Sequence, residues 1–258
     1  MDVVERFLAL LSHPPRAVLA LDYDGTLAPF REDRQTAYPY AAVPALLRGI
    51  VDGTDTRLVL VSGRPVAEVQ TLLGLDRAPE IWGCHGWEVR SAAGRLTRHP
   101  LPPGASAALD RAAAAVAAAG WAARSERKHA SVAVHWRAES DRACAAAAAR
   151  ALLAPLATRE LELLDFAAGL ELRCPAWDKG RALASVLADE PDDAPAAYLG
   201  DDRTDEDAFR VLAGRPRSLP ILIGGDPRAT AARVRLEPPA DLERFLADWR
   251  RAAARRCV

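Results

Sequence analysis

An α/β fold with a doubly wound, mostly parallel sheet and a separate α+β insert is predicted by three features of the sequence. Short apolar runs alternate with helical patterns near both ends of the chain, acidic or small residues directly follow those runs, and the middle of the chain has a different composition. We therefore expect residues 1–102 and 175–258 to form one discontinuous core, and residues 103–174 to form the insert.

The core begins with two apolar runs, at residues 17–21 and 58–61, which predict buried parallel strands. Helical periodicity at residues 43–51 and 66–73 places a helix after the first strand and another after the second. The alternation returns late in the chain, with a helix expected at 179–187, a strand at 196–199, a helix at 205–213 and a strand at 219–223. Strands that alternate with helices in this way are typical of a parallel sheet.

The middle of the chain combines Ala-rich helical stretches, at residues 105–119 and 142–153, with short strand-like segments. The segments lie at residues 131–136, 160–164 and 170–173. Leu101-Pro102-Pro103-Gly104 and Cys174-Pro175 flank the region like hinges. An Ala-rich region can also be a flexible linker, but the alternating His, Trp, Val and Leu positions favour a packed unit.

Composition excludes several classes of function. The 258 residues are 50% hydrophobic, which is enough for a sizeable core, and the formal charge is −1, with 34 basic and 35 acidic residues. This balance lacks the basic surface of a nucleic-acid binder, and no apolar run approaches the roughly 18 residues of a membrane span. We expect a monomer that acts on a small molecule in the cytoplasm. The scattered cysteines fit free thiols in a reducing compartment: Cys84, Cys144, Cys174 and Cys257.

Two carboxylates follow the first predicted strand, because Asp22 and Asp24 lie in the sequence LDYDGTLAP. Open α/β sheets bind ligands at the carboxyl ends of their strands. A cation such as Mg²⁺ would neutralise the crowded carboxylates, while one attacks phosphorus and the other handles protons. An ordinary turn stabilised by Asp side chains is the alternative explanation of this stretch.

A second acidic cluster, GDDRTDEDAF at residues 200–209, follows another predicted strand at the same edge of the sheet. Asp201 is the best further metal ligand, with Asp205 or Asp202 assisting. The later acids of the cluster, Glu206 and Asp207, are better explained as complements to a helix dipole, with Thr204 as the N-cap.

Two further positions fit a bound phosphate. Ser62 and Gly63 end the second strand before a helix, so a hydroxyl and free backbone N–H groups could bind phosphate oxygens there. A plain strand-to-helix turn would look similar. Lys179 opens a helix, where the dipole disfavours a cation, so either a surface position or a role in balancing a phosphate dianion would account for it.

Taken in order, the segments DYDGT, VSGRP, DKG and GDDRTDED resemble the four motifs of the haloacid dehalogenase superfamily, whose core is a Rossmann-like sheet. The resemblance implies that Asp22 attacks the phosphate to form an aspartyl-phosphate, and that Asp24 protonates the leaving group and then activates water. It also implies that Ser62 and Lys179 bind phosphoryl oxygens. Mg²⁺ would be held by Asp22, the backbone carbonyl of Asp24, and Asp201.

The insert lies where that superfamily carries a type-two cap, and its stretch ERKHASVAVHWR at residues 126–137 is similar to the trehalose-6-phosphate phosphatases. The resemblance implies hydrolysis of trehalose 6-phosphate, the last step of trehalose biosynthesis, with a trehalose-phosphate synthase as a possible separate partner. Trp136 stands where that family would have Tyr. The substrate-binding residues implied are Arg64, His85, Glu126, Lys128, Ser131, His135 and Glu171.

Other interpretations remain open on the residues alone. His135 on an alternating strand also fits a packed core histidine. A phosphohexomutase would carry a similar cap but return the phosphoryl group instead of releasing inorganic phosphate. A non-catalytic sugar-phosphate binding protein would not need the set Asp22, Asp24, Ser62, Lys179 and Asp201.

Overall fold

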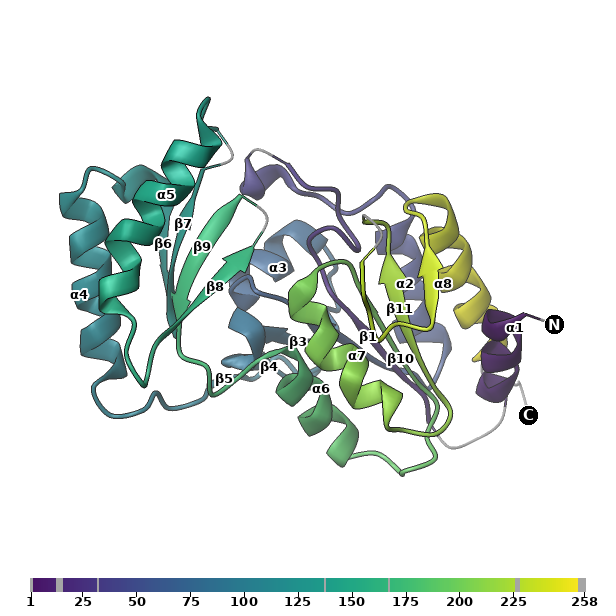
Figure 1. Cartoon of the computed structure of the whole chain (residues 1–258). Coiled ribbons are helices and arrows are strands. Elements are labelled where there is room, and N and C mark those ends of the chain that lie inside the picture. Colours follow the sequence, from purple (N-terminus) through teal and green to yellow (C-terminus); the bar gives the residue numbers. More distant parts are fainter. Residues whose placement is uncertain are drawn as a thin grey trace. The chain divides into compact units, whose positions relative to one another are not determined.

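The computed structural model describes residues 2–12, 16–31, 33–136, 138–166, 168–225 and 228–254 (Figure 1). The chain divides into two compact units. The core unit comprises Met1–Thr97 and Asp178–Val258, and the insert unit comprises Arg98–Trp177. Both divisions fall within a few residues of the Pro-containing segments that flank the insert in the sequence.

The core unit contains a sheet with the strand order β12-β11-β10-β1-β2-β3-β4-β5. The strands are β1 (Val18–Leu21), β2 (Arg57–Val61), β3 (Glu80–Gly83), β4 (Glu88–Arg90), β5 (Leu96–Arg98), β10 (Ala196–Gly200), β11 (Ser218–Ile223) and β12 (Val234–Leu236). All pairs from β12 to β3 are parallel, and β4 then runs antiparallel to β3. Because β1 lies between β10 and β2, Leu21 pairs with both Leu199 and Leu60.

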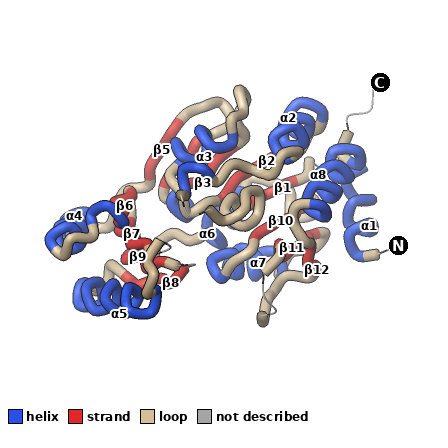
Figure 2. Tube along the Cα trace, turned by 90° about the horizontal axis from the view of Figure 1, so that it is seen from above, coloured by secondary structure: helices blue, strands red, loops and turns tan. Residues whose placement is uncertain are grey.

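Helices cover both faces of this sheet (Figure 2). They are α1 (Val3–Leu8), α2 (Val43–Gly53), α3 (Val66–Leu73), α6 (Lys179–Ala188), α7 (Glu206–Ala213) and α8 (Ala240–Ala252). Leu19 and Leu21 of β1 join one core cluster with α1, α2, α3 and α8, whereas α6 and α7 pack together on the other face. Successive strand residues point to opposite faces, and every residue of β1 is buried, as expected of a central parallel strand.

The insert unit contains an antiparallel sheet with the order β6-β7-β9-β8. Its strands are β6 (Ser125–Lys128), β7 (Ser131–His135), β8 (Glu162–Phe166) and β9 (Gly169–Arg173), and its helices are α4 (Ala105–Ala118) and α5 (Arg142–Leu153). Val132 and Val134 share a face with Leu170 and Leu172, and the two helices pack against that apolar face. The opposite face is therefore left to the alternate, largely polar positions.

Several element boundaries differ from those expected from the sequence. The strand predicted at 160–164 lies two residues later, at Glu162–Phe166. The helix predicted from residue 205 begins at Glu206, after a 3₁₀ turn over Arg203–Asp205 that Asp202, rather than Thr204, caps through its side chain. In the described part of the chain, no helix has the length and apolar character needed to cross a membrane.

Candidate active site

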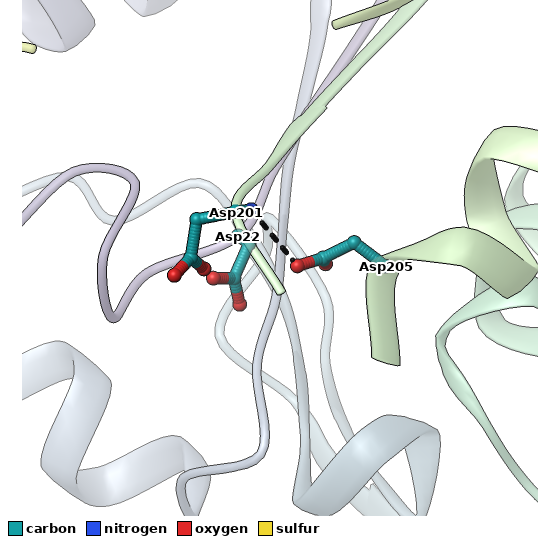
Figure 3. Close-up of side chains that lie close together, drawn as sticks. All are labelled: Asp22, Asp201 and Asp205. Carbon is teal, nitrogen blue, oxygen red and sulfur yellow. Dashed lines mark hydrogen bonds between the residues drawn. The ribbon is translucent and has the colours of Figure 1, made fainter. Parts of the chain in front are cut away.

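Three carboxylates converge at the carboxyl edge of the core sheet. Asp22 follows β1 and Asp201 follows the neighbouring strand β10, so the parallel register carries both residues to the same edge. Asp205 approaches from the 3₁₀ turn before α7. One oxygen from each of these side chains lies within 4.8 Å of the others. Figure 3 shows the three side chains lying close together. The sequence predicted Asp22 and Asp201 at this edge from the ends of their strands, and left open whether Asp205 or Asp202 assists.

Gly25 makes room for the Asp201 carboxylate. Its φ is +79°, in the left-handed region that glycine adopts without strain. A Cβ built at Gly25 would lie only 2.1 Å from Oδ2 of Asp201. Any other residue at position 25 would therefore have to displace the carboxylate as well as strain the turn.

Lys179 joins two of the three carboxylates. Its Nζ donates hydrogen bonds to Oδ1 of Asp22 at 2.7 Å and to Oδ1 of Asp205 at 2.8 Å. All three side chains are buried. Lys179 is the first residue of α6, whose N-cap is Asp178, so the helix start directs the ammonium group into the carboxylate cluster rather than to the surface.

Asp205 is the most fully hydrogen-bonded of the three acids. Besides Lys179, its Oδ1 accepts from the hydroxyl of Tyr198 at 2.7 Å. Its Oδ2 accepts from the backbone N–H groups of Asp201 and Asp202, each at 3.0 Å. These contacts fix the turn that presents Asp201, so Asp205 supports the site as well as adding charge.

Burial and mutual repulsion raise the pKa values of acidic side chains in the site. Burial raises the pKa of Asp22 to about 8, although Lys179 opposes this change. Burial also raises the pKa of Asp201 well above its ordinary value, and the charges of Asp22 and Asp205 add to the effect. For Lys179, burial alone would lower the pKa, but the carboxylates of Asp205 and Asp22 raise it well above 10.5. One ammonium is thus surrounded by more negative charge than it neutralises.

The donor atoms fit a hard divalent cation. No hydrogen bond from a described residue reaches the Asp201 carboxylate, and none reaches the second oxygen of Asp22. Carboxylate oxygens are ligands that Mg²⁺ prefers, and the space that Gly25 leaves open is the space that the Asp201 carboxylate occupies. A bound cation would also relieve the excess negative charge.

Asp24 points to a different partner. Arg64, just beyond β2, donates from Nε to Oδ2 of Asp24 and from an Nη to Oδ1, both at 2.6 Å. The Arg64 side chain is 4% exposed, and that of Asp24 is 28% exposed. Arg64 was expected among the substrate-binding residues, and its strongest contacts in this structure are with Asp24 instead.

Ser62, in the turn after β2, contacts His85, in the turn after β3. The Ser62 hydroxyl is buried and accepts a hydrogen bond from the backbone N–H of Arg64 at 3.1 Å. His85 donates its backbone N–H to the carbonyl of Ser62 at 2.9 Å, and its ring packs so closely on Gly63 that a Cβ there would lie 2.8 Å away. The β2 and β3 loops are therefore packed as one unit at the edge that holds Asp22.

Five residues predicted to bind substrate share one face of the insert sheet, opposite to its helices. They are Glu126, Lys128, Ser131, His135 and Glu171. Glu171 accepts hydrogen bonds from Lys128 Nζ at 3.0 Å and from Ser131 Oγ at 2.5 Å. Nε2 of His135 lies 4.0 Å from Glu126. The insert thus brings this set together through strand register, independently of the core.

Sequence reasoning missed supporting residues of the core site. Arg228 donates to the backbone carbonyl of Asp202 at 2.8 Å and pairs with Glu206, so it holds the turn that carries Asp201 from outside. Tyr198 lies within β10 and resembles any core aromatic in the sequence. The partner of a hydroxyl or guanidinium group leaves no periodic pattern in the sequence. These two contacts could therefore not be predicted from it.

Comparison with known proteins gives the family. The trehalose-phosphatase family matches residues 20–238. The trehalose-phosphate phosphatase of Mycobacterium marinum is 34% identical over 247 residues, which cover 90% of this chain and 60% of that protein. The probable trehalose-phosphate phosphatase 9 of Oryza sativa is 31% identical over 274 residues, which cover 93% of this chain and 71% of that protein.

Solved structures confirm the predicted fold class. The C-terminal domain of the Candida albicans trehalose-6-phosphate phosphatase matches with a TM-score of 0.80 at 19% identity, covering 96% of this chain and 97% of that one. A haloacid dehalogenase-like hydrolase from Bacteroides thetaiotaomicron matches with a TM-score of 0.63 at 15% identity, covering 90% and 98%. At such identities these likenesses show the fold alone. Through the family match and its relatives, the chain belongs to the trehalose-phosphatase family.

Proposed function

We propose that this chain hydrolyses trehalose 6-phosphate to trehalose and inorganic phosphate in a Mg²⁺-dependent reaction. The observation that carries the proposal is the buried cluster of Asp22, Lys179, Asp201 and Asp205 at the carboxyl edge of the core sheet. Membership of the trehalose-phosphatase family supports the choice of substrate. The named activity of relatives such as the Mycobacterium marinum protein agrees with it.

In the first half of the proposed reaction, an oxygen of Asp22 attacks phosphorus. A bond forms between that oxygen and phosphorus while the bond from phosphorus to the sugar oxygen breaks. Asp24 gives a proton to the departing sugar oxygen, so trehalose leaves as a neutral alcohol. Lys179, already held beside Asp22, and the Ser62 hydroxyl would bind the phosphoryl oxygens.

In the second half, water attacks the phosphorus of the aspartyl-phosphate. Asp24, now ionised, accepts a proton from that water, and the bond from phosphorus to Asp22 breaks. Inorganic phosphate is released and both carboxylates return to their initial states. One residue therefore serves as acid and then as base, which requires its carboxyl group to stay in place through both steps.

The cation would be held by Asp22, Asp201 and the backbone carbonyl of Asp24, with Asp205 in a supporting position. When bound, Mg²⁺ would offset the charge repulsion between a carboxylate nucleophile and a phosphate dianion. Asp205 is a weaker candidate for direct ligation because both of its oxygens already accept hydrogen bonds. Asp202 is engaged by Thr204 through two hydrogen bonds.

The polar face of the insert would supply contacts to sugar hydroxyls. Carboxylates accept hydrogen bonds and the Lys128 ammonium donates them, so Glu126, Glu171 and Lys128 offer both kinds of partner to a disaccharide. Ser131 and His135 would complete the set on this face, and His85 is proposed separately as a substrate contact of the core. Buried polar groups of this kind discriminate strongly, because a wrong sugar leaves them unpaired.

The test is phosphate release, with Mg²⁺, from trehalose 6-phosphate, sucrose 6-phosphate, glucose 6-phosphate and a mannosyl phosphoglycerate. A clear preference for trehalose 6-phosphate supports the proposal. Turnover of another sugar phosphate would keep the role of Asp22 and overturn the assignment of the insert residues. Transfer of phosphate between sugars without release would favour a phosphohexomutase instead.

A further inference from the structure

We propose that Arg64 is a positioning residue for Asp24, holding the carboxylate that gives and takes the proton, rather than a residue that contacts the sugar phosphate. This inference rests on the proposed function, because it concerns how one residue of that reaction is held. It assigns to the motif VSGRP a task that the sequence did not reveal.

The geometry between the two side chains is that of a bidentate ion pair. Nε of Arg64 donates to Oδ2 of Asp24 and an Nη donates to Oδ1, each at 2.6 Å. Such a fork of two parallel hydrogen bonds fixes the plane of a carboxylate as well as its distance. A single ammonium could hold Asp24 nearby but could not fix its plane.

Arg64 is itself anchored from the other side. Its remaining Nη donates to the backbone carbonyl of Arg34 at 2.9 Å and to Glu68 at 3.3 Å. Glu68 also pairs with the side chain of Arg34 at 2.7 Å, which joins α3 to the 3₁₀ turn at Arg34–Thr36. The guanidinium is thus tied to the fold by contacts that do not involve Asp24, and it can act as a fixed support.

The side chains of Arg64 and Asp24 differ in their exposure to solvent. The Arg64 side chain is 4% exposed, whereas that of Asp24 is 28% exposed. Among described residues, only Arg64 donates a side-chain hydrogen bond to the Asp24 carboxylate. Each carboxylate oxygen has about two lone-pair sites, and Arg64 occupies one on each. Asp24 therefore keeps free sites for a proton, while Arg64 is largely covered by protein.

The support matters because Asp24 lies on a short turn. Gly25, directly after it, has a φ of +79°. A carboxylate on such a turn could adopt several rotamers, and a displacement of about 1 Å in a reacting group can cost around a hundredfold in rate. The fork from Arg64 selects one orientation before substrate arrives.

The first experiment compares two substrates in the full-length R64K variant. With trehalose 6-phosphate the leaving group is an alkoxide that needs a proton, so kcat/KM should fall by about a hundredfold. With p-nitrophenyl phosphate the phenolate leaves without one, so kcat/KM should fall by less than about threefold. KM for trehalose 6-phosphate should change little. Equal decreases in kcat/KM for both substrates, or a decrease that comes only from a higher KM, would mean that Arg64 binds the phosphate directly.

A matched control is R57K. Arg57 begins the same strand, β2, and forms a similar fork with Glu80, at 3.0 and 3.1 Å, at the opposite edge of the sheet. Its replacement should change both kcat/KM values by less than about twofold, because no catalytic group depends on that fork. A similar loss in R57K would show that any weakened buried ion pair has this effect.

The second experiment is a double-mutant cycle. In the D24N background, R64K should cause no further loss on trehalose 6-phosphate, because its effect passes through the Asp24 carboxylate. Independent, multiplicative losses would overturn the proposal. If R64K fails to fold, as judged by circular dichroism, E68Q serves in its place, since it loosens the anchor of Arg64 and should give a smaller loss with the same dependence on the leaving group.

Failure of the proposed function would be recognised separately. If the wild-type protein hydrolyses a different sugar phosphate, that substrate replaces trehalose 6-phosphate in the comparison, and the prediction for R64K is unchanged. If D24N retains full activity on every sugar phosphate, the role of Asp24 is wrong and the inference about Arg64 fails with it.

Discussion

Nζ of Lys179 lies 2.7 Å from Oδ1 of Asp22, although the two residues are 157 positions apart in the sequence. The pair joins the first residue of α6 to the end of β1, in a region from which solvent is excluded. The charges of Lys179 and Asp22 therefore compensate each other, while Asp205, which also accepts a hydrogen bond from Lys179, adds a second negative charge. The same contact places the Lys179 ammonium group where an incoming phosphoryl group would meet Asp22, the proposed nucleophile.

Removal of the Lys179 charge is expected to damage both activity and stability. In K179M, Asp22 and Asp205 lose a buried counter-charge, and breaking a buried pair in this way costs about 3–5 kcal/mol. Phosphate release should fall by at least about a hundredfold, because a preorganised donor to the transferring group is lost. Urea unfolding and steady-state kinetics measure the two effects. Full activity in a folded K179M protein would remove Lys179 from the mechanism.

Replacement of the nucleophile should abolish turnover without loss of the fold. D22N removes the attacking charge with almost no change in volume, so the far-ultraviolet circular dichroism spectrum should be unchanged while phosphate release disappears. The control is D207N in α7, where the half-buried Asp207 pairs with Arg210 and is not part of the carboxylate cluster. Turnover by D22N at the wild-type rate would exclude a covalent role for Asp22.

Gly25 offers a test of the metal site that does not depend on turnover. In G25A, the new Cβ would lie 2.1 Å from Oδ2 of Asp201, so the carboxylate must move. We expect Mg²⁺ affinity, measured by calorimetry, to fall by at least about tenfold, as for disturbed metal-site residues in general.

The matched control is G74A. Gly74 also has a positive φ, +62°, but a Cβ there would meet nothing within 4 Å. G74A should cost about 1 kcal/mol of stability from backbone strain and leave Mg²⁺ binding unchanged. Equal Mg²⁺ affinities in G25A and G74A would show that Asp201 does not contribute to the site.

The core site was predictable because its chemistry follows buried strands. The apolar runs before Asp22 and Asp201 fix β1 and β10, and parallel strands deliver their carboxyl ends to one edge. The insert residues were named through the family resemblance, and period-two alternation then accounts for Ser131 and His135 lying on the same face of β7. In both cases the backbone pattern decides where the side chains lie.

The partner of each side chain was not predictable in the same way. Arg64 could have met substrate, solvent or a carboxylate, and only the packed loops bring it to Asp24. The helix α8 and the strand β3 were also missed. Trp249 of α8 is buried and donates to Thr56 at 2.9 Å, a contact between distant segments that local periodicity does not contain.

The metal should be needed for turnover and should stabilise the folded protein. A chelator is expected to stop phosphate release, and added Mg²⁺ to restore it. Because the cation binds the assembled carboxylates and not the unfolded chain, Mg²⁺ at about a hundred times its dissociation constant should add about 2.7 kcal/mol to the free energy of unfolding. Unfolding with and without Mg²⁺ measures this value. Unchanged stability together with unchanged turnover would exclude a metal site.

The cysteines give a prediction that is independent of the catalytic site. Cys144 is exposed, whereas Cys84 and Cys174 are buried. Burial raises the pKa of Cys174 above its ordinary value of 9.0, although Arg127 opposes the change, so the folded state disfavours the reactive thiolate. In a C257S background, a thiol reagent at pH 8 should modify Cys144 quickly and leave Cys174 unmodified until the protein unfolds.

The Cys174 thiol should make the folded protein less stable as the pH rises. Because the pKa of Cys174 is higher in the folded than in the unfolded state, its contribution to stability is fully present below pH 9 and is lost as the pH rises through the folded-state pKa. In the same C257S background, the free energy of unfolding should therefore fall more steeply above pH 9 than it does in a C257S/C174A variant, which lacks the titrating thiol. Parallel pH profiles for the two proteins, or rapid labelling of Cys174 in the folded state, would contradict the buried position of this side chain.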